Sequence, residues 1–382
     1  MSEQLSQYDE IRPYSPEELP AVLSELLEDP MFTAIVQNFF QGVPVEALKA
    51  KMLSCRNNLE FQKAFIYPLI KQLLAKNCTG LTFESALEPT KRYTYVSNHR
   101  DIVLDSALLS IVLIENGFED TPEIAIGDNL LIYPWIKKLV RVNKSFIVQR
   151  SLSMREMLES SRRMSSYMHY AINEKQQSIW IAQREGRAKD SNDRTQESVL
   201  KMMAMGGEGT PTERLKSLNI APLSISYEYD PCDYLKAQEF QQKRDNPDFK
   251  KSREDDLKNM QTGIFGYKGQ VHYQVAPCIN EWIDEISTLP KGEFFSAVAQ
   301  RMDADIFRNY RLYPGNYVAV DLLEGSTRFA SHYTEEQKQQ FEKYVQSRIA
   351  LVELPNPDTA YLRERILEMY ANPVLNQLSV QQ

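Results

Sequence analysis

Residues 94–105 read TYVSNHRDIVLD, and this stretch joins a short strand to a helix. The aromatic and β-branched run over 92–97 predicts the strand, and the apolar run over 102–114 predicts the helix. His99 falls between the two. Ligands of open α/β sheets lie at the carboxyl ends of strands, so a general base could act at this position. The alternative is a histidine that only caps or packs against the helix start.

Two aspartates follow His99 and compete to hold its second ring nitrogen. Asp101 and Asp105 are four residues apart, so they share one helix face if the helix begins before Asp101. A carboxylate in this role would orient the imidazole and stabilise its protonated form. We expect the aspartate that does not meet His99 to complement the helix dipole from the first turn.

The chain beyond this stretch alternates strands with helices. Strands are predicted over 123–126, 146–148, 178–182 and 221–227, with helical patterns between most of them. Alternation of this kind indicates βαβ units. The sequence therefore predicts an α/β fold with a mixed, largely parallel sheet flanked by helices.

Two later segments carry weaker patterns. Residues 264–267 and 271–275 are strand-like and resemble a late hairpin. Residues 233–260 are rich in charged side chains, which is typical of a solvated helix face or a mobile insertion.

Helical patterns dominate both ends of the chain. Residues 15–18, Ser-Pro-Glu-Glu, form a capping box with proline at the first helical position, and apolar residues follow at helical spacing. We expect a helical N-terminal domain over 1–88 and an α/β domain over 89–290. A helical C-terminal extension over 291–382 is expected to pack on the α/β domain.

The composition excludes several classes of protein. The 382 residues carry 44 Lys and Arg against 52 Asp and Glu, a net charge of −8. A general nucleic-acid binder is usually basic, so we expect no nucleic-acid partner. No apolar run approaches the roughly 18–20 residues that span a bilayer, and we expect no signal peptide. The four cysteines form no Cys-x-x-Cys pair, which favours buried, reduced thiols in a reducing compartment.

A basic run stands out against this acidic balance. Five basic residues and no acidic one lie between positions 137 and 150: Lys137, Lys138, Arg141, Lys144 and Arg150. The run could bind phosphate, the phosphates of coenzyme A or anionic lipid. A solvated helix face is the alternative.

Two further blocks follow predicted strands. Residues 183–189 read QREGRAK, where Gly186 permits a tight turn while Arg187 and Lys189 could grip a phosphate. The alternative is an ordinary charged turn. Residues 221–228 read APLSISYE, a buried strand with proline near its start.

Taken together and in this order, the four blocks resemble those of the glycerophospholipid acyltransferase family. The first resembles that family's Asn-His motif with its later Asp, and the second its stretch that ends in Phe-Ile-x-Arg. The third resembles Glu-Gly-Thr/Gly-Arg-Ser-Arg, and the fourth its proline-containing strand. The resemblance covers about residues 90–280 and is closest to glycerol-3-phosphate and 1-acylglycerol-3-phosphate acyltransferases.

Two departures from the family pattern concern spacing. Five residues, not four, separate His99 from Asp105, and one residue is missing between Gly186 and Arg187. A loop around His99 would absorb the extra residue, whereas a helix would turn Asp105 by about 100°. The apolar helix aligns from Asp105, which favours it over Asp101, the fallback.

The resemblance implies a glycerolipid O-acyltransferase of phospholipid biosynthesis. Such an enzyme moves a fatty acyl group from acyl-CoA or acyl carrier protein to a hydroxyl of glycerol-3-phosphate or a lysophospholipid. His99 would be the general base and Asp105 would orient it. No cofactor and no metal are expected. The residues implied in acceptor and phosphate binding are Arg150, Glu185, Gly186, Arg187 and Lys189.

The lipid substrate implies a peripheral protein on the cytoplasmic face of a membrane, attached through the basic run and exposed apolar residues. A non-catalytic lipid-binding protein with the same fold, or an acyltransferase for another acceptor, is the alternative. A phosphotransferase is disfavoured, although residues 99–101 spell His-Arg-Asp. Ser106 stands where a kinase needs asparagine, and no glycine-rich phosphate loop precedes it.

Overall fold

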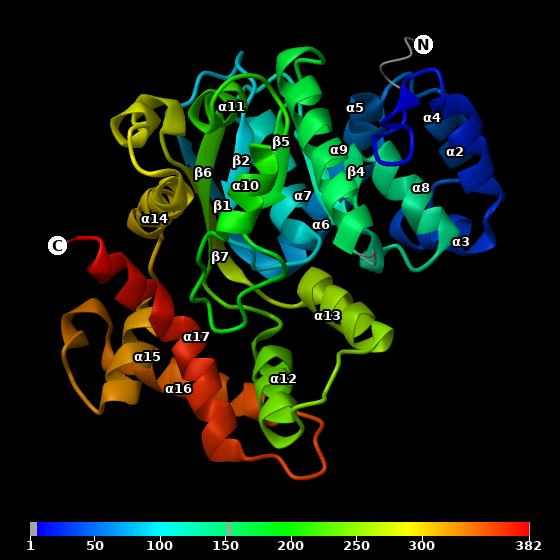
Figure 1. Ribbon diagram of the computed structural model, residues 1–382. Helices are drawn as coiled ribbons and strands as arrows, with labels where there is room; N and C mark the ends of the chain where they lie inside the picture. The colour runs from blue at the N-terminus through cyan, green and yellow to red at the C-terminus, as the bar shows by residue number, and fades with distance from the viewer. Residues whose placement is uncertain (1–5, 151–153, 382) are drawn as a thin grey trace.

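The computed structural model describes residues 6–150 and 154–381, and a seven-stranded sheet forms its centre (Figure 1). The strands lie in the order β1-β7-β6-β2-β5-β3-β4. Their bounds are β1 (Cys78–Ser85), β2 (Thr94–Ser97), β3 (Glu123–Gly127), β4 (Ser145–Val148), β5 (Ile179–Ala182), β6 (Ile220–Tyr227) and β7 (Gly269–Val275).

Five neighbouring strands, from β6 to β4, run parallel to one another. β7 pairs antiparallel with β6 and parallel with the edge strand β1. The predicted mixed, largely parallel sheet is therefore confirmed. Because these five strands share one direction, their carboxyl ends meet at a single edge of the sheet.

Helices cover both faces of the sheet, as its buried, apolar strands require. Neighbouring residues of β2 point to opposite faces: Tyr95 packs in the cluster of α6 and α7, while Val96 packs in the cluster of α9, α10 and α14. The bounds of the covering helices are α6 (Tyr67–Asn77), α7 (Leu104–Glu115), α9 (Met154–Asn173), α10 (Glu197–Met203), α11 (Pro211–Ser217) and α14 (Lys291–Arg308).

The N-terminal helices form a small cluster of their own that packs on α8. Its core includes Leu23, Phe61 and Val142. The elements are α2 (Leu19–Glu28), α3 (Pro30–Phe39), α4 (Val45–Leu53), α5 (Asn58–Phe61), the π-helical turn η1 (Gln62–Ile66) and α8 (Pro134–Val142). The expected helical domain over 1–88 needs correction at its end, because residues 78–85 are strand β1 of the sheet. β1 is a partly exposed edge strand and so lacks the apolar run that marks the central ones.

The C-terminal helices pack with α12 in a separate cluster beneath the carboxyl edge of the sheet (Figure 1). Their bounds are α12 (Asp233–Asp245), α15 (Pro314–Glu324), α16 (Glu335–Ile349) and α17 (Thr359–Ser379). α14 links them to the sheet because it contacts both β6 and α17. Short 3-10 turns complete the chain: η2 (Asp128–Leu130), η3 (Ile279–Glu281), η4 (Ile283–Ile286) and η5 (Ala330–His332).

The structure corrects two expectations for the segment before β7. Residues 264–267 form no hairpin with 271–275, since 264–265 end helix α13 (Arg253–Phe265) and β7 pairs with β1 and β6 instead. The charged segment 233–260 is not a solvated insertion throughout. Its first helix, α12, buries Asp233 and Lys236 against partners of opposite charge.

The structure bears on two further points of the sequence analysis. No helix in the described ranges is long and apolar enough to cross a membrane. All four cysteines lie in the described part of the chain, and none forms a disulfide.

Candidate active site

The loop between β2 and α7 is fixed to the neighbouring strand by Asn98. Its amide donates to the carbonyl of Ile225 at 2.9 Å and accepts from the Ile225 N–H at 2.8 Å. The side chain thus continues the pairing of β2 with β6 by one residue. Asn98 is fully buried, so both bonds are shielded from water. The backbone just before His99 is therefore held firmly against β6.

His99 and Asp105 meet directly at this edge. Nδ1 of His99 lies 2.8 Å from Oδ2 of Asp105, whose side chain is fully buried, while the His99 side chain is 14% exposed. A carboxylate only accepts hydrogen bonds, so the contact places the ring proton on Nδ1 and leaves Nε2 as an acceptor. The edge of His99 also packs against Trp180 of β5, with ring centroids 5.6 Å apart.

Asp101 has a different set of partners. One of its oxygens accepts from the N–H groups of Val103 and Leu104, at 2.9 and 2.8 Å, so it caps the first turn of α7. Burial, together with the charge of Asp105, raises the pKa of Asp101. The helix begins at Leu104, and the loop absorbs the extra residue of the motif. The structure thus brings Asp105, and not the fallback Asp101, to His99.

The Asp105 carboxylate accepts hydrogen bonds from the loop before α7 and from β6. Oδ2 also accepts from the backbone N–H groups of Arg100 and Asp101, and Oδ1 accepts from the hydroxyl of Tyr227 on β6 at 3.1 Å. The Tyr273 hydroxyl of β7 donates to the backbone carbonyl of Asp105 at 2.8 Å. Sequence reasoning missed both tyrosines. Tyr227 stood in the fourth block, where only a buried strand was predicted.

The third block lies at the same edge, after β5. Gly186 has a φ of +66°, so glycine suits this turn. Nη2 of Arg187 donates to Asn259 of α13 at 2.9 Å, whereas its buried Nη1 has no hydrogen-bond partner in the described part of the chain. Burial opposes the charge of Arg187, but Cys232, Asp230 and Asp101 nearby outweigh it and raise the pKa of the guanidinium. Arg187 therefore has a donor left for a ligand.

The other predicted phosphate-binding residues are placed less favourably. Lys189 forms an ion pair with Glu239 of α12 at 2.6 Å, and burial lowers its pKa. Arg150 follows β4 and packs over Gly127, where a Cβ would come within 2.9 Å of its Nε. Its guanidinium lies 3.8 Å from the exposed carboxylate of Glu185. These side chains line the edge but already have partners.

The basic run over 137–150 does not form one patch. Arg141 is buried and donates to the carbonyls of Arg12 and Asp9, while Lys144 is buried against Asp120. Lys138 pairs with Glu25 at 2.6 Å. Lys137 and Arg150 are the exposed members. The five cations point to different surroundings because the chain passes from α8 into β4 within the run.

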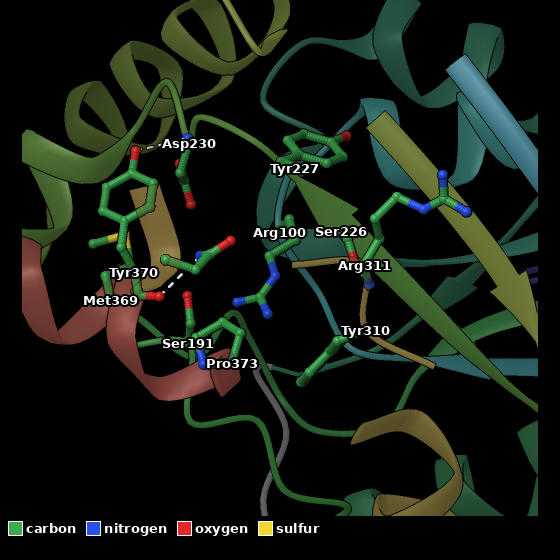
Figure 2. Close-up of a pocket in the computed structure, with 11 residues that line it drawn as sticks. Arg100, Ser191, Ser226, Tyr227, Asp230, Tyr310, Arg311, Met369, Tyr370 and Pro373 are labelled. Carbon is green, nitrogen blue, oxygen red and sulfur yellow. Dashed lines mark hydrogen bonds between the residues drawn. The ribbon is translucent and has the colours of Figure 1, made fainter. Parts of the chain in front are cut away.

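A polar cavity adjoins the site between the end of β6 and α17 (Figure 2). Arg100, Tyr227 and Asp230 are among its lining residues, so Tyr227 contributes to both the cavity and the site. Arg100 forms an ion pair with Asp193 at 3.0 Å, and Asp230 pairs with Lys236. The charges around the cavity are thus balanced in pairs.

No group of three or more His, Cys, Asp and Glu in the described ranges could hold a metal ion. The site offers instead a histidine whose Nε2 is an acceptor, a carboxylate bonded to its Nδ1, and Arg187 at the same edge of the sheet. A histidine held in this way is suited to taking a proton from a hydroxyl.

Comparison with known proteins identifies the class. Residues 80–225 match the family model described as Acyltransferase, and this range runs from β1 to β6 with the His99 loop inside it. This part of the chain is therefore similar to the acyltransferase family. The resemblance read from the four blocks, and with it the expectation of an acyltransferase enzyme, is confirmed.

Among solved structures, the 1-acyl-sn-glycerophosphate (LPA) acyltransferase PlsC from Thermotoga maritima matches this chain. The match has a TM-score of 0.37 at 11% sequence identity, and it covers 75% of this chain and 95% of that one. No curated protein sequence matches the chain.

Proposed function

We propose that this protein transfers a fatty acyl group from an acyl thioester to a hydroxyl of glycerol-3-phosphate or a lysophospholipid. The observation that carries the proposal is the contact of His99 with Asp105 at 2.8 Å, at the carboxyl end of β2 and inside the acyltransferase domain. The reaction belongs to phospholipid biosynthesis. Its donor is acyl-CoA or acyl carrier protein.

In this mechanism, Nε2 of His99 takes the proton of the acceptor hydroxyl as its oxygen attacks the thioester carbonyl carbon. Asp105 keeps the other ring proton on Nδ1 and stabilises the imidazolium that forms. The tetrahedral intermediate then collapses, and the carbon–sulfur bond breaks. The proton passes from His99 to the leaving sulfur, which departs as a thiol.

Arg187 is the first choice for holding the acceptor phosphate. Its Nη1 is buried without a hydrogen-bond partner in the described part of the chain, and leaving such a donor unpaired costs free energy. A phosphate oxygen would satisfy it by a charge-assisted hydrogen bond. Arg150 and the turn at Glu185 and Gly186 lie at the same edge, whereas Lys189 would first have to leave Glu239.

We further propose that the protein works at the cytoplasmic face of a membrane, as a peripheral protein. β3 and β4 are neighbours, and the segments that follow them expose apolar side chains: Tyr133, Met157 and Leu158. Lys137 and Arg150 are exposed in the same segments. Apolar side chains beside cations are suited to the surface of an anionic bilayer.

The decisive experiment is an acyl-transfer assay. Palmitoyl-CoA and palmitoyl carrier protein are offered with glycerol-3-phosphate and with lysophosphatidate in parallel. We expect transfer to one acceptor, reduced about 10²–10⁴-fold in His99→Ala, since the general base is lost. His332→Ala is the matched control, because His332 is exposed on η5. Equal rates in wild type and His99→Ala, or no transfer by the wild type, would refute the proposal and favour a lipid-binding role.

A further inference from the structure

The Asp105 carboxylate has two oxygens with different partners. Oδ2 faces His99 and the two backbone N–H groups of the loop, while the hydrogen bond on Oδ1 comes from the Tyr227 hydroxyl at 3.1 Å. Tyr227 lies at the last position of β6, opposite Val271 of β7. The register of the sheet thus sets where its hydroxyl reaches Asp105.

We propose that Tyr227 is a positioning residue, which fixes the Asp105 carboxylate so that Oδ2 stays aimed at His99. This inference rests on the proposed function of His99 as the base. A carboxylate held through one oxygen alone can rotate about its Cβ–Cγ bond. A hydrogen bond on the second oxygen removes that freedom and draws part of the negative charge away from His99.

The Tyr227 hydroxyl can serve only as a donor in this place. Burial, helped by neighbouring Tyr273 and Asp105, raises the pKa of Tyr227 well above its ordinary value. It therefore keeps its proton throughout the working pH range and donates to the carboxylate. Hydrogen bonds to charged groups contribute more than those between neutral groups, especially where water is excluded.

Several charged and titratable groups surround Asp105. They are His99, Arg100 and Asp101 from the loop before α7, Tyr227 from β6 and Tyr273 from β7. Lys268 in turn faces Asp101. Of the two tyrosines, Tyr227 bonds to the carboxylate and Tyr273 to the backbone carbonyl.

The two tyrosines, Tyr227 and Tyr273, allow a matched test of the positioning role. Tyr227→Phe and Tyr273→Phe each remove one buried hydroxyl from neighbouring strands, but only the first removes a hydrogen bond to the carboxylate. Without it, the carboxylate becomes a stronger acceptor for His99 and favours the imidazolium. We expect the acidic limb of the pH profile of kcat/KM to move to higher pH in Tyr227→Phe, and kcat to fall about tenfold, with the acceptor KM unchanged.

A second readout needs no turnover. We expect the proton between His99 Nδ1 and Asp105 to give a downfield proton NMR signal, which would be assigned by its absence in His99→Ala. We expect this signal to move in Tyr227→Phe and to stay in Tyr273→Phe. A moved signal in a protein that transfers no acyl group would uphold the positioning role and reject the proposed function. An unmoved signal and pH profile, or equal changes in both variants, would overturn the role of Tyr227.

Discussion

At the scale of single residues, the site is a buried carboxylate surrounded by donors. Asp105 is fully buried, and no lysine or arginine side chain of residues 6–150 or 154–381 bonds to it. Backbone N–H groups, a hydroxyl and an imidazole compensate its charge instead. Asp101, four residues earlier, is also buried, but it accepts its hydrogen bonds from backbone N–H groups at the start of α7. Two aspartates four residues apart, one before α7 and one in its first turn, therefore bond to different groups.

This difference predicts opposite outcomes for two identical substitutions. Asp105→Asn should lower kcat about 10³–10⁴-fold, because an amide no longer fixes the proton on Nδ1 of His99. Asp101→Asn should keep most activity and keep or raise the melting temperature, since asparagine also caps helices and a costly buried charge is removed. Parallel acyl-transfer assays and thermal unfolding measure both effects.

The reverse result would reassign the two residues. If Asp101→Asn lost activity while folding normally and Asp105→Asn did not, the orienting carboxylate would be Asp101. Circular dichroism of both variants controls for loss of structure.

At the scale of elements, α14 anchors the segment that follows β5. Asp303 of α14 accepts from the N–H and the hydroxyl of Thr195, at 2.8 and 2.6 Å. Thr195 lies between the Arg187 turn and α10. A helix from the C-terminal part of the chain therefore holds the segment that follows Arg187, the residue proposed to bind phosphate.

The same contact predicts a pH dependence of stability. Burial raises the pKa of Asp303 to about 6, although the bonds from Thr195 oppose this. A carboxyl of the unfolded chain titrates near 4, so between about pH 4 and pH 6 the folded state binds more protons. This group should lower the free energy of unfolding by about 2–3 kcal/mol as the pH rises through that range. Urea unfolding at several pH values measures the fall.

Two variants isolate the contribution of Asp303. In Asp303→Asn the free energy of unfolding should fall less between pH 4 and pH 6, because the amide does not titrate. Glu293→Gln changes an exposed residue of the same helix and should show the same fall in unfolding free energy as the wild type. A pH slope that is identical in wild type and Asp303→Asn would show that Asp303 does not titrate there.

At the scale of the whole molecule, the carboxyl edge of the sheet is enclosed on one side and exposed on the other. α12 and the C-terminal helices cover the end of β6, where Asp233 joins Arg348, Tyr344 and Tyr370. The ends of β3 and β4 instead carry exposed apolar side chains and the exposed cations Lys137 and Arg150. A lipid substrate would reach His99 from this second side.

Membrane binding is the prediction that belongs to this scale. The protein should sediment with vesicles of phosphatidylcholine and phosphatidylglycerol at low salt, and less so at high salt, because exposed charges are screened. Lys137→Glu should weaken the binding several-fold. Lys343→Glu, an equal charge change on the exposed surface of α16, should not. Protein that stays in the supernatant with anionic vesicles at low salt would contradict the proposed membrane role.

Much of this arrangement could be predicted from short-range patterns. The residue types over 94–105 predict the strand, the loop and the start of the helix around His99. The alternation of strands with helices along the chain predicts the parallel sheet. Sequence patterns gave the wrong prediction in three segments. α12 buries charged side chains in ion pairs, and the edge strand β1 is partly exposed, so neither shows an apolar pattern. The basic run is divided by the turn between α8 and β4, which places its members in different surroundings.

The sequence by itself determined the fold class, the four blocks and the position of His99 at a strand end, because these depend on residues close together in the chain. The sequence favoured Asp105 as the partner of His99, but only the tertiary structure decided between it and Asp101. The tertiary structure alone also shows that Tyr227 and Tyr273 bond to Asp105, and that Nη1 of Arg187 has no hydrogen-bond partner within the described ranges. The tyrosines lie 122 and 168 residues from Asp105. Their contacts depend on strand order and register, which local patterns do not encode.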